Sequence, residues 1–152
     1  MYYETSVRIA ASARKVWAVL RDVERWPEWT PTVRRVDRVE SAPEYVPGAD
    51  GPSGELAEGD VVSIKQPRMP TLSWTVVDWN PARSFAWSAS GAGVRTVADH
   101  RIEATDDLGV TVTLSIRQSG PLAPVIGFLT GRQTRRYVDT EATSLKNRCE
   151  QR

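Results

Sequence analysis

The 152-residue sequence predicts an α+β fold in which a curved, seven-stranded antiparallel sheet wraps around a long C-terminal helix, with two short helices near the N-terminus. Three observations support this prediction. The chain opens with a strand-like alternation of apolar and polar residues, and residues 59–119 contain further such segments separated by turn residues. The remainder, to about Cys149, has helical periodicity. One domain over residues 1–152 is the expectation for this length.

The first predicted elements are a strand and two short helices. Residues 3–9 alternate between apolar and polar side chains, which predicts a half-buried strand. Ser12 is placed to cap a helix whose apolar face begins at Val16. Pro27 ends any continuous helix, so residues 23–29 are expected to form a second, short helix or a turn.

The central part of the chain predicts strands and turns. Apolar residues are irregularly spaced in the strand predicted at 32–40, which indicates a β-bulge. Residues 41–58 contain three prolines and three glycines without periodicity, so they are expected to form a loop, whose role stays open. Pro121 suits the first turn of the last helix. The further strands are expected at residues 60–66, 72–79, 84–88, 94–104 and 110–118.

Alternation along each strand identifies the side chains that face the interior. In residues 110–116 the even-numbered positions are apolar, so they are expected to point inward. On the preceding strand Ile102 fixes the parity, which places Ala98 and His100 on the inner face. The segment 72–79 leaves two alternatives open, because two sets compete for its inner face: Leu72, Trp74 and Val76, or Val77 and Trp79.

Several motifs resemble a known superfamily. An S-x-x-x-V-W-x-x-L-x-D segment followed by W-P-x-W is present at Ser12, Val16, Trp17, Leu20, Asp22, Trp26, Pro27 and Trp29. Later segments read G-D-x-V-x-I-K-Q-P from Gly59, W-x-V-x-x-W-x-P from Trp74, H-R-I-E from His100 and G-P-L-A-P from Gly120. In this order the motifs resemble the START-like, or SRPBCC, superfamily of polyketide cyclases, lipid-transfer domains and pollen-allergen-type ligand carriers.

The resemblance implies a helix-grip (START-like, Bet v 1-like) fold with a hydrophobic cavity between the sheet and the C-terminal helix. The first functional expectation is therefore the binding of a hydrophobic small molecule, such as a lipid, polyketide or isoprenoid-like compound. The alternative is an enzyme of the polyketide cyclase, aromatase or dehydratase type acting in that cavity. A third possibility is an interaction module whose interior is filled by its six tryptophans.

Catalytic members of the polyketide branch place an arginine or other polar residues inside the cavity. Residues 72–79 contain no Arg or Lys, which disfavours cyclisation of aromatic polyketides and leaves open whether the chain is an enzyme. His100, the only histidine, is the candidate general acid or base, or simply a residue of the pocket wall. No carboxylate on its own strand shares its face, so a neutral ring is expected in apolar surroundings.

The tryptophans allow a binding and a structural interpretation. Trp74 and Trp87 either stack on a ligand or build the core. In the family the short helix borders the cavity mouth, and of its two tryptophans Trp29 is the preferred pocket residue. For Trp26 a structural role, supporting the turn at Pro27, is at least as good an explanation. The complete set of ligand-binding candidates is Trp29, Val62, Ile64, Trp74, Phe85, Trp87, Ala98, His100, Leu114 and Ile126.

Composition limits the partners. Lys and Arg number 20 and Asp and Glu 19, so the near-neutral chain gives no electrostatic reason to expect nucleic acid. The basic cluster Arg132, Arg135 and Arg136 is interpreted as a solvated helix face. No apolar run reaches the roughly 18 residues of a membrane span, so no stable membrane insertion is expected. The oligomeric state stays open.

Cysteine usage and motifs complete the expectations. Cys149 is the only cysteine and lies far from His100 in sequence, so neither a disulfide nor a thiol nucleophile is expected. The sequence has no metal-ligand cluster and no phosphate-binding glycine loop, so no metal and no cofactor are expected. The N-terminus lacks the charged and apolar regions of a signal peptide, and a cytoplasmic location is the expectation.

Overall fold

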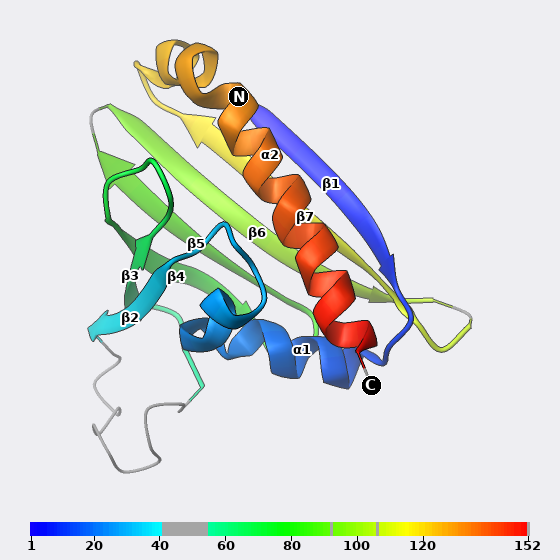
Figure 1. The fold of residues 1–152 in the computed structure, drawn as a ribbon. Helices are drawn as coiled ribbons and strands as arrows, with labels where there is room; N and C mark the ends of the chain where they lie inside the picture. The colour runs from blue at the N-terminus through cyan, green and yellow to red at the C-terminus, as the bar shows by residue number, and fades with distance from the viewer. Residues whose placement is uncertain (41–54, 92, 106, 152) are drawn as a thin grey trace.

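The computed structural model describes residues 1–40, 55–91, 93–105 and 107–151 (Figure 1). Within them, seven strands form one antiparallel sheet in the order β1-β7-β6-β5-β4-β3-β2, and the long helix α2 crosses its concave side. The predicted fold class is confirmed. The elements are β1 (Tyr2–Ile9), α1 (Ala13–Arg21), the 3-10 helix η1 (Val23–Glu28), β2 (Arg35–Glu40), β3 (Val61–Lys65), β4 (Leu72–Asn80), β5 (Ser84–Gly91), β6 (Val94–Ala104), β7 (Val110–Ser119) and α2 (Ala123–Glu150).

The N-terminal helices begin and end as the sequence predicts. The hydroxyl oxygen of Ser12 accepts a hydrogen bond from the amide of Lys15 at 3.2 Å, which satisfies a free donor at the start of α1. The chain then leaves the α-helical path at Asp22 and continues as η1, which contains Pro27. The indole nitrogen of Trp26 donates to the carbonyl of Leu20 at 3.0 Å and ties the two helices together.

The strand predicted at residues 32–40 is shorter than expected. It begins at Arg35, because the hydroxyls of Thr30 and Thr32 hydrogen-bond at 2.8 Å in a buried turn. The register shift between Arg38 and Glu40 confirms the predicted bulge. Most of the predicted loop, residues 41–54, lies outside the described residues.

A second register shift determines which side chains of β4 point toward the interior. It lies between Val76 and Asp78, opposite β5. The extra residue reverses the alternation, so Trp74 and Val76 are buried on the inner face and Trp79 also packs against the core. The two alternatives that the sequence left open are therefore both partly right.

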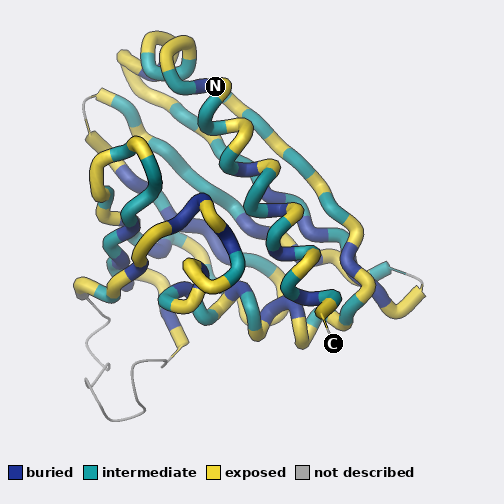
Figure 2. The backbone as a smooth tube through the Cα atoms, in the orientation of Figure 1, coloured by how far each residue is buried: buried dark blue, intermediate teal, exposed yellow. Residues whose placement is uncertain are grey.

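The inner face of β7 agrees with the predicted parity. Val110, Val112 and Leu114 are at most 3% exposed, whereas Thr113 hydrogen-bonds Ser6 on the outer face at 2.9 Å. Buried positions gather where the sheet, α1 and the C-terminal half of α2 meet (Figure 2).

A pair of substitutions tests this parity. Leu114→Ala is expected to lower the free energy of unfolding by about 2–5 kcal/mol, because it leaves a hole in a packed surface. Thr113→Ala removes only an outer-face hydroxyl contact and is expected to cost less than about 1 kcal/mol. Urea melts of both variants give the order, and a larger loss for Thr113→Ala would reverse the assigned faces.

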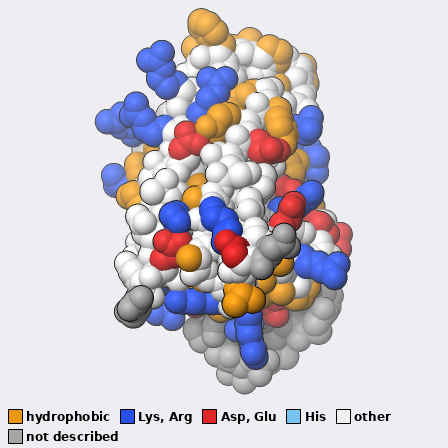
Figure 3. Space-filling model, turned by 90° about the vertical axis from the view of Figure 1, so that its right-hand side faces the viewer, with side chains coloured by type: hydrophobic (Ala, Val, Ile, Leu, Met, Phe, Trp, Pro, Cys, Tyr) orange, Lys and Arg blue, Asp and Glu red, His pale blue; other side chains and the backbone are white. Residues whose placement is uncertain are grey.

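The long helix begins slightly later than predicted. Pro121 lies in the turn before α2, and Pro124 occupies the first helical turn. Gly127 allows α2 to pass close to the N-terminus, since a Cβ there would lie 3.2 Å from that of Met1. Leu122, directly before α2, is 46% exposed, at an end of the molecule where hydrophobic side chains gather (Figure 3).

The C-terminal half of α2 supplies the buried stripe. Val138, Ala142, Leu145 and Cys149 face the core. Burial raises the pKa of the Cys149 thiol to about 11, which disfavours the nucleophilic thiolate. Among the helices that the structure describes, none combines the length and apolarity that crossing a bilayer requires.

Candidate functional site

A cavity of about 470 Å³ lies between the sheet and α2. It falls within the range of about 300–1,000 Å³ that is typical of small-molecule sites. Strands β5, β6 and β7 form one wall, α2 forms the opposite wall, and the β3–β4 turn and η1 complete it. Its apolar lining includes Trp26, Val33, Ile64, Met69, Leu72, Trp74, Trp87, Ala89, Ala98, Leu114, Ile116, Ile126 and Val138.

The structure brings seven of the ten ligand-binding candidates to this cavity. They share the inner face of the sheet or the facing side of α2, and they are Ile64, Trp74, Trp87, Ala98, His100, Leu114 and Ile126. Met69, from the β3–β4 turn, also lines it.

Three candidates lie elsewhere. Val62 and Phe85 face inward as predicted, but both are 0% exposed and neither lines the cavity. The ring of Phe85 stacks on His100 with centroids 4.1 Å apart and contacts Trp17 and Trp26, so core side chains cover it completely. An inward-facing position on the sheet is therefore not sufficient for access to the cavity.

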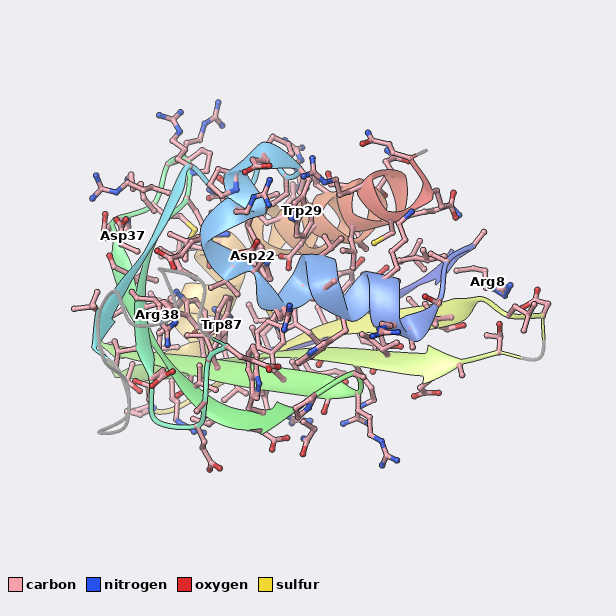
Figure 4. All side chains as sticks on the ribbon, turned by 90° about the horizontal axis from the view of Figure 1, so that it is seen from below. Arg8, Asp22, Trp29, Asp37, Arg38 and Trp87 are labelled. Atoms are coloured by element: carbon pink, nitrogen blue, oxygen red, sulfur yellow. The ribbon has the colours of Figure 1, made fainter. Side chains whose placement is uncertain are left out.

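The preference for Trp29 over Trp26 is corrected. Trp26 lines the cavity, whereas Trp29 borders a small groove formed with α1 and the C-terminal part of α2. In Figure 4 Trp87 lies against the sheet and Trp29 lies apart from it, beside η1. The reason is local: η1 aligns Val23 and Trp26, but the backbone of Trp29, with φ −128°, has left the 3-10 helix.

His100 lines the cavity from the inner face of β6. Its ring is 4% exposed and contacts the edges of Trp26 and Trp87, each with centroids 5.6 Å away. Nδ1 lies 3.2 Å from the carbonyl oxygen of Phe85. Because a carbonyl oxygen can only accept, this contact requires the hydrogen to be on Nδ1. Nε2 is left facing α2.

A carboxylate from α2 faces that nitrogen. Oε1 of Glu141 lies 3.5 Å from Nε2 of His100, and the Glu141 side chain is 15% exposed. This oxygen is buried and has no hydrogen-bond partner among the described residues. When the hydrogen of a neutral ring is on Nδ1, Nε2 can only accept a hydrogen bond, and the carboxylate oxygen can also only accept one. The two atoms therefore need either a proton shared between them or a hydrogen-bond donor from a ligand. Strand parity could not reveal this acidic neighbour, because Glu141 comes from α2. The neutral ring stays a prediction.

Other polar residues of α2 were also missed from the sequence. Thr130, Thr134, Tyr137 and Glu141 continue from Ile126 along one side of the helix and line the cavity. Their spacing of three and four residues, which places them on one side of a helix, was the available signal. The Tyr137 hydroxyl donates to the carbonyl of Pro67, and Gln133 reaches the same oxygen at 3.5 Å, so α2 holds the β3–β4 turn over the cavity.

The part of the cavity lining that the structure describes contains acidic side chains but no lysine or arginine. Among the described residues that line the cavity, Asp99 and Glu141 are acidic and none is Lys or Arg. Asp99 pairs with Arg101 at 3.3 Å, so Glu141 remains the acidic group opposite His100. In the part of the chain that the structure describes, no group of three or more His, Cys, Asp or Glu could hold a metal ion.

Comparison with solved structures shows the fold shared by proteins of low sequence identity. A hypothetical protein from Helicobacter pylori superposes with a TM-score of 0.76 at 14% identity, covering 98% of this chain and 86% of that one. The Zhui aromatase/cyclase from a Streptomyces species gives 0.74 at 19% identity over 99% and 93% of the two chains. A START superfamily protein from Mycobacterium smegmatis gives 0.69 at 14% identity over 98% and 97%.

Sequence comparison identifies the family directly. No curated protein matches the chain. The family model described as polyketide cyclase / dehydrase and lipid transport matches residues 3–150, nearly the whole sequence. The START-like resemblance of the motifs is thereby confirmed. The chain therefore belongs to the polyketide cyclase/dehydrase and lipid transport family.

Proposed function

We propose that this protein binds an uncharged, largely apolar small molecule in the cavity between the sheet and α2. The observation that carries the proposal is the 470 Å³ space itself, whose largely apolar wall contains three tryptophans, Trp26, Trp74 and Trp87. Such concave sites with a few polar groups are typical of small-molecule binding. A lipid, a polyketide or an isoprenoid-like compound fits this description, and membership of the family supports the class.

The polar groups indicate the chemistry of one end of the ligand. Neither Lys nor Arg is among the described lining residues, so a ligand carboxylate or phosphate would have no Lys or Arg partner and would lie close to the Glu141 carboxylate. Oε1 of Glu141 instead requires a hydrogen-bond donor. A ligand hydroxyl or N–H group would satisfy it. We therefore infer an apolar ligand with one donor group near His100 and Glu141.

An uncharged fluorescent probe tests the proposal. N-phenylnaphthylamine is apolar and carries one N–H donor. We expect saturable binding with a dissociation constant of roughly micromolar order, because a preformed apolar pocket buries most of such a ligand. Trp87→Ala, which changes the cavity wall, is expected to alter the affinity. A titration without saturation would indicate that the interior is closed to ligands and would contradict the proposal.

A second candidate function is acid–base catalysis in the same cavity. It is favoured by the 3.5 Å approach of Glu141 to His100, which gives the site a group able to take up and return a proton. The apolar wall would exclude water and hold a substrate in a folded conformation. In this reading the pair moves a proton between two positions of the bound substrate, as a cyclisation or dehydration requires.

The proton arrangement of the pair is measurable without a substrate. In ¹⁵N NMR of the single imidazole we expect Nδ1 of His100 to carry hydrogen at every pH at which the protein is folded, because it donates to the Phe85 carbonyl. Glu141→Gln supplies an amide donor to Nε2, so it should leave a neutral ring with hydrogen on Nδ1 only. Observation of the Nε2–H tautomer in the native protein would remove the basis of the acid–base candidate.

A further inference from the structure

The first turns of α2 carry a concentrated patch of exposed hydrophobic side chains. We call it the apolar tip: Leu122, Val125, Phe128 and Leu129, which are 46%, 54%, 89% and 69% exposed. Four of the seven large hydrophobic side chains that the described residues expose are thus in one place. Exposure of this kind marks an interaction site when it is contiguous and not scattered over the surface.

A basic collar, consisting of Arg132, Arg135 and Arg136, follows the apolar tip along α2. None of the three forms an ion pair with a residue that the structure describes. The sequence has no Asp or Glu between Asp107 and Asp139, so this part of the chain carries only positive charge. Figure 3 shows hydrophobic side chains at this end and basic side chains directly beneath them, with acidic side chains farther away.

We propose that the apolar tip and the basic collar dock the protein on an anionic lipid surface. At about 1.5 Å per residue, Arg132 lies roughly 6 Å farther along the helix than Phe128. This separation matches the roughly 5–10 Å depth to which interfacial helices bury apolar side chains, with arginines at the level of the headgroups. The arrangement suits peripheral docking through the end of a helix, without insertion across the bilayer.

Charge argues against a second copy of the chain as the occupant. Two apolar tips that met face to face would bring two basic collars together, and like charges disfavour such contact. An anionic surface has the opposite effect, because it attracts each arginine by about 1 kcal/mol close to the membrane. The near-neutral total charge of the chain hides this local asymmetry.

The proposed docking surface adjoins the cavity. Ile126 and Thr130, on the neighbouring side of the same helical turns, line the cavity. Gly91, an exposed residue of the lining, is the last residue of β5. Nearby, the carbonyl of Gly93 accepts a hydrogen bond from the amide of Leu122 at 3.1 Å. Docking would therefore bring one end of the cavity to the lipid surface. The docking proposal itself does not depend on the cavity being occupied.

Vesicle co-sedimentation of the full chain tests the proposal. The probes are vesicles of phosphatidylglycerol with phosphatidylcholine, and vesicles of phosphatidylcholine alone. We expect partition to the anionic vesicles only, weakened by added salt. Phe128→Asp should reduce this partition by at least about tenfold, since it removes the most exposed side chain of the apolar tip and adds a negative charge that the anionic lipid repels. The matched control is Leu108→Asp, at an equally exposed leucine (91%) in the β6–β7 connection, and it should leave partition unchanged.

Further outcomes of these experiments either support or overturn the docking proposal. Absence of partition to anionic vesicles would overturn it, as would equal losses in Phe128→Asp and Leu108→Asp. A double variant, Arg132→Gln with Arg136→Gln, should weaken partition without affecting the apolar tip. If light scattering shows a dimer that Phe128→Asp converts to a monomer, the apolar tip joins two copies of the chain and does not bind lipid.

Discussion

Replacement of Trp26 by alanine is expected to lower the free energy of unfolding by about 3–5 kcal/mol. The indole is 2% exposed, packs against Trp87 with ring centroids 5.3 Å apart and donates a hydrogen bond to Leu20 at 3.0 Å. Removal of the ring leaves a hole beside the existing cavity and an unpaired carbonyl. Urea denaturation of the variant gives the magnitude.

Trp29→Ala is the matched control for this substitution. Trp29 belongs to the same segment, packs against Trp26 with tilted rings whose centroids are 5.3 Å apart, and is partly exposed. We expect a loss below about 2 kcal/mol, since water can fill the vacated space. A larger loss for Trp29→Ala than for Trp26→Ala would restore Trp29 as the inward-facing residue and contradict the described path of η1.

Ala98→Trp is expected to weaken binding of N-phenylnaphthylamine by at least about tenfold, because the indole would occupy the space that the probe requires. Ala98 lines the cavity at the middle of β6, between the rows that carry Trp87 and Ile116. The existing space accommodates the larger side chain, so we expect the variant to fold with a loss of about 1–3 kcal/mol at most. A fluorescence titration measures the affinity.

Val97→Trp provides the control for Ala98→Trp. Val97 is the preceding residue of β6, so its side chain lies on the opposite face of the sheet. A tryptophan is well tolerated on the outer surface of a strand, and probe binding should be unaffected. If both variants bind the probe as the unaltered protein does, the binding site lies outside the cavity.

Most of the fold was predictable because alternation and capping are local properties of the sequence. The parity of residues 110–116 required only that one face be apolar, and the structure buries that face. Ser12 and Pro27 mark boundaries for reasons contained within a few residues. The motifs added the topology, which local patterns alone do not determine.

The candidate site was less predictable because it depends on where separate elements meet. Strand parity placed Phe85 on the inner face, but only packing beneath Trp17 and Trp26 decides that it does not reach the cavity. Glu141 is distant from His100 in sequence, and only the crossing of α2 over β6 brings them together. The choice between Trp26 and Trp29 depended on one backbone angle at the end of η1.

The most direct test of the central claim is a crystal structure of the protein grown with N-phenylnaphthylamine. The account predicts density for the probe between β6 and α2, in contact with Trp26 and Trp87, with its N–H directed toward Oε1 of Glu141. Density in the groove beside Trp29, or an interior filled by side chains without room for the probe, would contradict the proposal that this cavity binds an apolar ligand.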